Sequence, residues 1–198
     1  MIAIPALLAV IVVFLLSWLR QRDVVDYKQF FSDNQQELTL YADAFLEQDC
    51  IGGISRFRNF NGVNYNVIVK NDVTYGKTAR ISFTVPYWEK PYWKVSDISG
   101  IRADYWYPNM TLGSFLTANG ITEEEFLKWR AYLTDNDFLA IGGVYGEENM
   151  LEISKTNWSG FLYRKDPGLD FGYAPSFIDM LNDNWCYYNE QGIPYPRD

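Results

Sequence analysis

The chain has 198 residues, 17 of them basic and 25 acidic, and its formal net charge at pH 7 is −8. The basic residues are scattered along the sequence, so they form no concentrated patch that could displace counterions from nucleic acid. The chain has no histidine, which excludes Ser-His-Asp catalysis, Cys-His catalysis and every metal site that needs a histidine ligand. We therefore expect neither nucleic-acid binding nor a cofactor.

Residues 1–19 carry no charged side chain and are mostly apolar. As a helix they would reach about 28 Å, close to the thickness of the hydrocarbon core of a bilayer. A cleaved signal peptide is the alternative, but the segment begins without Lys or Arg and ends in Ser17-Trp18-Leu19-Arg20, without a small-x-small cleavage site. The pattern predicts an uncleaved, single-pass anchor in the lipid bilayer.

The basic residues next to this segment bear on its orientation. Arg20, Arg22 and Lys28 all follow the apolar stretch, which favours a cytoplasmic location for the rest of the chain. An extracytoplasmic location stays open at this point. In that compartment Cys50 and Cys186 could form a disulfide, whereas in the cytoplasm both would remain reduced thiols.

Residues 20–50 are expected to form a juxtamembrane helix, because apolar residues recur at helical spacing between Val24 and Phe45. The polar triplet Ser32-Asp33-Asn34 is the point at which this helix could be interrupted. Cys50-Ile51-Gly52-Gly53 ends it.

Residues 51–198 are predicted to form one α+β globular domain with an antiparallel sheet and packed helices. Stretches 53–60 and 63–71 flank Asn61-Gly62, a dipeptide that favours a β-hairpin turn. Stretch 77–88 alternates apolar and polar residues until Pro86, which suits the end of a strand or an edge strand. Stretch 100–107 is a further strand candidate, and we expect a meander with one face in water.

The middle of the chain is predicted to be helical. Stretch 111–120 has a short helical pattern that ends at Asn119-Gly120, a suitable left-handed cap. Stretch 121–133 has the capping-box residues Thr122 and Glu125, followed by an amphipathic pattern. We expect this second helix to pack on one face of the sheet.

The last third of the chain returns to strands. We expect strands at 138–146, 149–154, 160–165 and 185–190, with a turn at Glu147-Glu148-Asn149 between the first two. Stretch 174–183 is predicted to be a short helix with Ser176 as its N-cap.

Aromatic residues are abundant, with 7 Trp, 15 Tyr and 13 Phe. Tyr92, Trp93, Tyr105 and Trp106 lie in two stretches that mix aromatic residues with Pro and charged residues. If these rings are exposed, they form a binding patch for a protein or a sugar. If they are buried, they belong to the core of the sheet.

Carboxylates are the remaining candidates for chemistry. Glu147, Glu148, Asp166 and Asp170 could act as an acid/base pair or hold Ca²⁺ or Mg²⁺. The turn sequence Asp166-Pro167-Gly168 explains part of this set without catalysis. We expect no catalytic residue and no metal site.

The stretch from Asp137 to Asp183 resembles the second half of SUKH-superfamily domains. The residues that carry the likeness are strand 138–143 with its glycines, strand 150–153, strand 160–165 with Asp166, and Ala174-x-Ser176-Phe177 up to Leu181. The resemblance implies a non-catalytic α+β binding domain. Many members of that superfamily are immunity proteins that occupy a toxin, and others are scaffolds in cell-wall regulation.

Three functions follow as expectations. The first is a membrane-tethered, non-enzymatic protein-binding domain, immunity-like or an assembly subunit, whose partner is another protein such as a toxin or a membrane complex. The second is an extracytoplasmic domain that binds glycan or envelope through the aromatic patch. The third is a carboxylate-dependent hydrolase.

Overall fold

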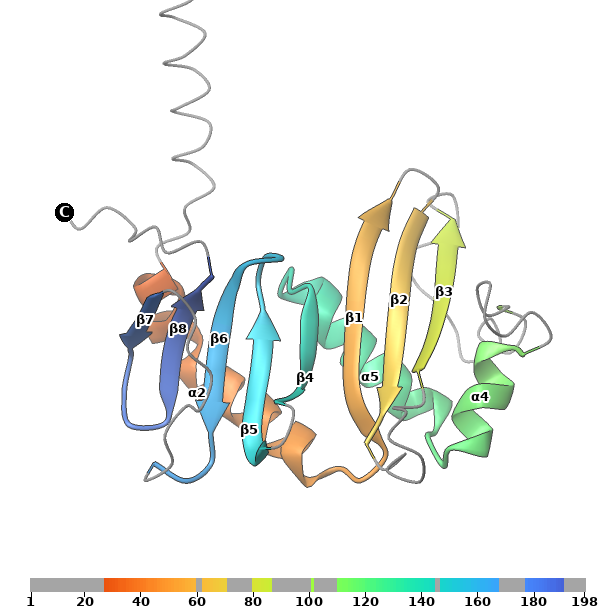
Figure 1. Cartoon of the computed structure of the whole chain (residues 1–198), viewed down its shortest axis with the longest axis horizontal. Helices are drawn as coiled ribbons and strands as arrows, with labels where there is room; N and C mark the ends of the chain where they lie inside the picture. Colours follow the sequence, from red (N-terminus) through yellow and green to blue (C-terminus); the bar gives the residue numbers. More distant parts are fainter. Residues whose placement is uncertain are drawn as a thin grey trace, which may run out of the picture.

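The computed structural model describes residues 27–59, 62–70, 80–86, 101, 110–144, 147–167 and 177–190. These residues contain three helices and eight strands (Figure 1). The helices are α2 (Tyr27–Glu47), α4 (Leu112–Ala118) and α5 (Glu123–Asp135). The strands are β1 (Ile51–Asn59), β2 (Gly62–Val69), β3 (Arg80–Pro86), β4 (Ala140–Val144), β5 (Glu147–Ser154), β6 (Ser159–Arg164), β7 (Phe177–Met180) and β8 (Trp185–Asn189).

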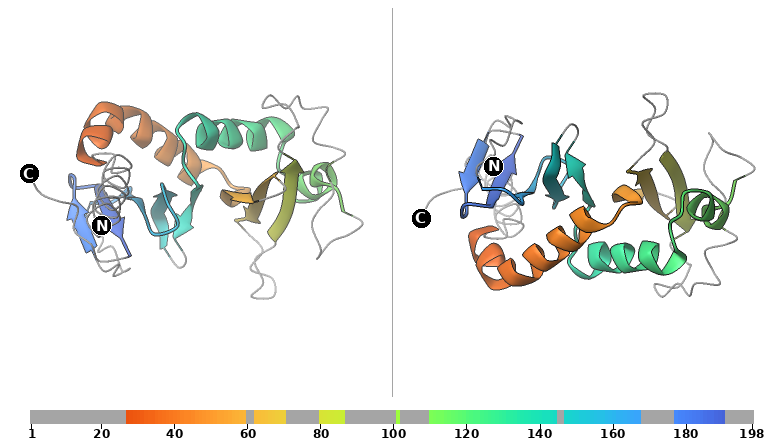
Figure 2. Two further views of the ribbon diagram at one scale, coloured as in Figure 1. Left: turned by 90° about the horizontal axis from the view of Figure 1, so that it is seen from above. Right: turned by 90° about the horizontal axis from the view of Figure 1, so that it is seen from below.

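The strands form one sheet in the order β3-β2-β1-β4-β5-β6-β8-β7, and every neighbouring pair is antiparallel. The predicted α+β class with an antiparallel sheet is therefore confirmed. Helices α2 and α5 both lie on the same face of the sheet (Figure 2). We call this the inner face and the opposite one the outer face.

Helix α2 packs on the inner face through one apolar stripe. Its buried residues are Phe31, Leu38, Ala42 and Phe45, which recur at the three- and four-residue spacing of one helix face. Each fully buried Phe or Leu side chain contributes about 2 kcal/mol of hydrophobic stabilisation. The helix predicted next to the membrane is thus part of the core of the sheet, and it continues without a break through residues 32–34.

Aromatic side chains fill the space between the helices and the inner face. Phe31 from α2 lies against Phe161 of β6 and Trp185 of β8, with ring centroids 6.2 and 5.8 Å apart. Phe126 from α5 meets Phe83 of β3 edge to face at 5.9 Å. Offset and edge-to-face aromatic pairs add to the energy of area burial, so the two helices hold opposite ends of the sheet.

The sheet has a narrow junction between β1 and β4. Strands β1 and β2 share eight paired positions, whereas β1 and β4 share only three: Gly53 with Gly142, Ile54 with Ile141 and Ser55 with Ala140. A Cβ at position 142 would lie 3.3 Å from the Gly53 Cα, so a glycine here lets the two backbones approach. The junction divides the sheet into a three-stranded half (β3-β2-β1) and a five-stranded half (β4-β5-β6-β8-β7).

The predicted caps of α4 and α5 are present. Gly120 follows α4 with a left-handed φ of 71°, and the Ile121 amide donates to the Leu116 carbonyl at 2.9 Å, as in a Schellman motif. The Thr122 hydroxyl accepts from the Glu125 amide at 3.1 Å and so caps α5.

Three details of the sequence-based prediction are wrong. Residues 177–180 form strand β7 instead of a helix, because backbone pairing with β8 at four positions outweighs the weak capping signal of Ser176. Residues Glu147–Asn149 begin strand β5 instead of forming a turn. In the predicted hairpin, Gly62 is already paired with Asn59, so the turn falls one residue earlier than Asn61-Gly62.

In the described part of the chain, none of the helices is both long and apolar enough to cross a membrane. The predicted anchor at residues 1–19 and the strand predicted at 100–107, apart from Ile101, lie outside the described residues. The anchor remains a prediction.

Candidate functional site

The four residues of the predicted aromatic patch, Tyr92, Trp93, Tyr105 and Trp106, lie outside the described residues. The chain that bounds them is described. Pro86 ends β3, and the Leu112 amide at the start of α4 donates to the Ile101 carbonyl at 2.7 Å. The patch therefore belongs to the connection between β3 and α4, which are elements of the three-stranded half of the molecule.

The two cysteines are free thiols in the structure, so the disulfide considered for an extracytoplasmic domain is not formed. Cys50 directly precedes β1, and its thiol donates to the Gly120 carbonyl at 3.4 Å. Cys186 lies on β8, four strand positions away in the sheet order, which corresponds to about 19 Å at the usual spacing of strands. A disulfide needs Cα atoms within about 7 Å.

Three of the four candidate carboxylates are brought to one end of the β5–β6 pair. Met150 pairs with Arg164, and the Lys165 amide donates to the Asn149 carbonyl at 3.0 Å. Glu147 and Glu148 begin β5 and Asp166 follows the end of β6, whereas Asp170 lies outside the described residues. Among the described residues, no group of three potential metal ligands is close enough to hold an ion.

The outer face of the three-stranded half carries a hydrogen-bonded polar row whose central residue, Asn66, is only 5% exposed. Ser55 on β1, Asn66 on β2 and Ser82 on β3 occupy one cross-strand row. The Asn66 amide donates to the Ser55 hydroxyl at 3.2 Å, and the Ser82 hydroxyl donates to the Asn66 carbonyl oxygen. Next to this row, Phe57 exposes 40% of its surface. The hydrogen bonds of the row fix its polar side chains, and the Phe57 ring beside it stays partly exposed to water.

The outer face of the five-stranded half has a different character. Met150, Leu162, Cys186 and Tyr188 form a buried cluster on it, separate from the main core. Burial raises the pKa of the Cys186 thiol to about 12, so this cysteine is a protonated apolar group and not a nucleophile at neutral pH.

Tyr188 connects three strands of this outer face. It lies on β8 opposite Gly160 of β6, yet its hydroxyl donates to the Glu152 carboxylate on β5. The ring can cross β6 because Gly160 has no side chain in its way. The same Glu152 oxygen accepts from the Ser154 hydroxyl at 2.7 Å. Burial and the Glu152 carboxylate raise the pKa of Tyr188, so the phenol is a hydrogen-bond donor without acid/base activity at neutral pH.

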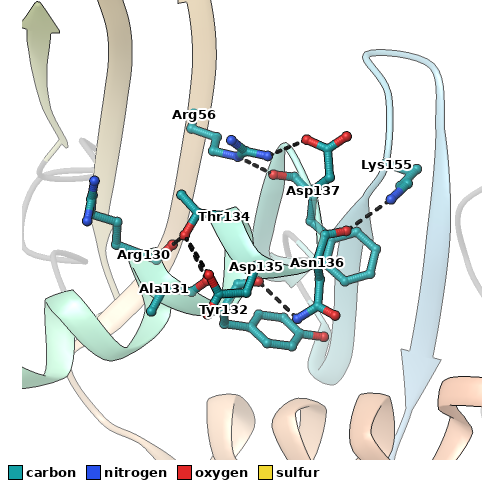
Figure 3. Close-up of polar contacts among 10 residues, drawn as sticks. Arg56, Arg130, Ala131, Tyr132, Thr134, Asp135, Asn136, Asp137 and Lys155 are labelled. Atoms are coloured by element: carbon teal, nitrogen blue, oxygen red, sulfur yellow. Dashed lines mark hydrogen bonds and ion pairs between the residues drawn. The ribbon is translucent and has the colours of Figure 1, made fainter. Parts of the chain in front are cut away.

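A second polar cluster lies on the inner side of the junction between the two halves (Figure 3). The Arg56 guanidinium on β1 donates to the Phe138 carbonyl at 2.6 Å and to the Asp137 carboxylate at 2.7 Å. Its side chain is 9% exposed, whereas that of Asp137 is 75% exposed. Asp137 follows α5 with a left-handed φ of 51°, a backbone conformation that usually favours glycine at the end of a helix.

Lys155 closes the same turn from β5. Its ammonium donates to the Asn136 carbonyl at 3.0 Å (Figure 3). It also lies 5.2 and 5.1 Å from the centres of the Phe30 and Phe138 rings. Burial lowers the pKa of Lys155, and the Asp137 carboxylate opposes that shift. The contacts with the two rings and the carbonyl all favour the charged ammonium, so Lys155 joins α2, α5 and β5 as a structural cation.

Sequence reasoning did not find Phe57, the Tyr188–Glu152 contact or the Arg56–Asp137 pair. Phe57 stands between Arg56 and Arg58, and strand alternation would assign the phenylalanine to the buried face, whereas in the structure Arg56 is buried and Phe57 is exposed. The two contacts join residues 36 and 81 positions apart, and no local pattern reports such a distance. Gly160 was the one local signal, because a glycine inside a strand indicates a close approach of another group.

Comparison with protein-family models, with curated proteins and with solved structures found no match to this chain. The resemblance of residues 137–183 to SUKH-superfamily domains stays a prediction. In the structure this stretch includes β4, β5, β6 and β7.

Proposed function

We propose that this protein is a membrane-tethered, non-enzymatic protein-binding domain, and that the outer face of its three-stranded half is the contact surface. One observation carries the proposal: this face has no described helix over it, and it exposes Phe57 beside a hydrogen-bonded row in which Ser55 and Ser82 are half-buried and Asn66 is buried. Exposed aromatic side chains next to fixed polar groups are typical of the anchors of protein interfaces.

Two further features support binding rather than catalysis. The hydroxyl and thiol groups of Tyr188 and Cys186 both have raised pKa values, whereas catalytic nucleophiles need lowered ones or an adjacent base. Tyr92, Trp93, Tyr105 and Trp106, which follow β3 in the sequence, remain candidate contact residues in this proposal. The partner is another protein, either a toxin, in an immunity-like role, or a membrane complex in which this chain is an accessory subunit.

The contact surface can be tested with a photo-crosslinking amino acid placed in the full chain in its own cells. We expect a discrete adduct when the probe replaces Phe57, and none when it replaces Leu40, a control residue on α2 that is 69% exposed. Changing Trp93 and Trp106 to Ala should reduce the Phe57 adduct several-fold without unfolding the domain. Equal adducts at Phe57 and Leu40, or none at either position, would contradict the proposed surface.

A reporter fused after Asp198 tests the compartment. Activity of a reporter that works only inside the cell would agree with the orientation that Arg20 and Arg22 favour. Activity of one that works only outside would favour the alternative of an extracytoplasmic glycan- or envelope-binding domain. The disulfide that was expected with that alternative is not formed, because Cys50 and Cys186 are free thiols in the structure.

A further inference from the structure

One corner of the five-stranded half brings together the beginning of α2 and the last strand of the sheet. The Tyr27 hydroxyl donates to the Asp179 carboxylate at 2.6 Å, and the Lys28 ammonium pairs with the same carboxylate at 2.8 Å. The Tyr27 ring stacks on Tyr187 with centroids 3.9 Å apart. The first turn of α2 is thus fixed to β7 and β8.

The β5–β6 turn reaches the same corner. Ser159 pairs with Asn189, which pairs with Phe177, and the Glu190 amide donates to the Trp158 carbonyl at 2.8 Å. Figure 1 shows the start of α2, the start of β7, the end of β8 and this turn at the same end of the strands. We call Trp158, Ile178 and Lys28 the N-terminal corner.

The N-terminal corner exposes large apolar side chains on a rigid frame. Trp158 is 52% exposed and Ile178 is 37% exposed. Hydrogen bonds hold the turn below the indole: the Trp158 amide donates to the Thr156 hydroxyl at 3.1 Å, and the Lys155 and Thr156 amides donate to the Ser159 carbonyl at 2.9 and 3.0 Å. The tryptophan is therefore presented to solvent by a backbone that is already ordered.

The length of the preceding chain limits the distance between this corner and the predicted anchor. Residues 20–26 separate Leu19 from Tyr27, and a fully extended chain of that length spans about 28 Å. The far end of α2, at Glu47, lies about 30 Å further along the helix. If residues 1–19 cross a bilayer, this linker keeps the start of α2 within about 28 Å of it, so the N-terminal corner is the end of α2 that can reach the surface most easily.

We propose that the N-terminal corner docks on the lipid headgroup region of the bilayer, with Trp158 and Ile178 at the level of the headgroups and Lys28 toward anionic lipid. The inference rests on the tether in the proposed function. Tryptophan is enriched at the interface between membrane and water, and Arg20, Arg22 and Lys28 supply positive charge near the surface. This orientation turns the three-stranded half, with Phe57, away from the lipid.

Spin labels in the full chain test this orientation. The chain would be reconstituted in phosphatidylcholine vesicles with and without phosphatidylglycerol, in a Cys50→Ser background that keeps the buried Cys186. One label is placed at Ile178→Cys. A matched control is placed at Phe57→Cys, because Phe57 is 40% exposed and Ile178 37%. The collision rates of each label with oxygen and with a polar nickel complex are then measured.

We expect the label at position 178 to collide several-fold less with the nickel complex than the label at 57, to keep its collisions with oxygen, and to show a larger difference with phosphatidylglycerol. Equal nickel accessibility at 178 and 57 in chains that float with the vesicles would overturn the docking and leave the tether intact. Low accessibility at 178 to both reagents would show that protein covers the corner, and would also overturn it. Chains that do not float would remove the tether itself, whereas crosslinking at Phe57 tests partner binding separately.

Discussion

The two halves of the sheet use their outer faces in opposite ways. In the five-stranded half the outer face buries Met150, Leu162 and Cys186 and is crossed by the Tyr188–Glu152 contact. In the three-stranded half the outer face carries the polar row Ser55, Asn66 and Ser82 and exposes Phe57. Both inner faces pack against helices. The difference teaches that the five-stranded half buries an apolar cluster on its outer face as well as on its inner face, whereas the outer face of the three-stranded half is the one that we propose for contact with a partner.

Glycine substitutions on the two outer faces should have the largest difference in effect. Gly160 lies under Tyr188 in the five-stranded half, and a Cβ there would clash with the Ile153 carbonyl and lie 2.8 Å from the Ser154 Cα. Because both are backbone atoms of β5, the strands would have to separate. We expect Gly160→Ala to lower the free energy of unfolding by about 3 kcal/mol or more in chemical denaturation.

Gly53→Ala is the matched control on the outer face of the three-stranded half. A Cβ at position 53 would meet its nearest atoms at 3.5 and 3.6 Å, which is ordinary van der Waals contact. We expect a change of about 0.5 kcal/mol or less. Equal losses at Gly160 and Gly53 would show that the two outer faces are packed alike.

Asp137 tests the connection between the halves. Changing it to Ala removes the carboxylate from Arg56, which remains buried with the Phe138 carbonyl as its acceptor. We expect a loss of about 2 kcal/mol in the free energy of unfolding. Asp137→Gly removes the same ion pair but relieves the left-handed backbone at φ 51°, so it should cost about 1 kcal/mol less than the alanine variant.

Gly120→Ala gives the cost of an alanine at a left-handed position that has no ion pair, because Gly120 has a φ of 71°.

In the Asp137 variants, hydrogen exchange should accelerate more at the Arg56 amide than at amides between β5 and β6. The Arg56 amide reports on the junction because it donates to the Leu139 carbonyl at 2.7 Å. Equal stabilities of the Ala and Gly variants at position 137 would mean that backbone strain has no part in this turn.

Local elements of both halves could be predicted from the sequence. Alternation up to Pro86 identified β3, and Thr122 with the amphipathic pattern after it identified α5, because each signal is contained within a few residues. The four residues of β7 fit helical and strand spacing equally well, and their pairing with β8 decided the outcome. A short apolar segment takes its structure from its tertiary neighbours.

The order of the strands in the sheet could not be predicted from such local signals. β1 lies beside β4, and β8 lies between β6 and β7, yet no residue pattern in these strands specifies those neighbours. The contrast between the outer faces depends on that order, because it places the Tyr188–Glu152 contact across β6 and leaves Phe57 in the other half. The class of fold was therefore predictable, and the order of the strands, on which the proposed contact surface depends, was not.

The smallest expected effect on stability concerns Cys186, because it is absent at neutral pH and appears only in alkali. The pKa of the thiol is raised from 9.0 to about 12 in the folded protein, so above pH 9 the unfolded chain releases a proton that the native state keeps. This thiol therefore leaves the free energy of unfolding unchanged below pH 9 and lowers it as the pH rises toward 12.

We expect the free energy of unfolding to fall with pH above 9, and to fall less steeply in Cys186→Ala. An unchanged slope in Cys186→Ala would show that burial of this thiol is not the source of the alkaline sensitivity, and would leave Tyr188, whose pKa is also raised, as the titrating group of the outer cluster.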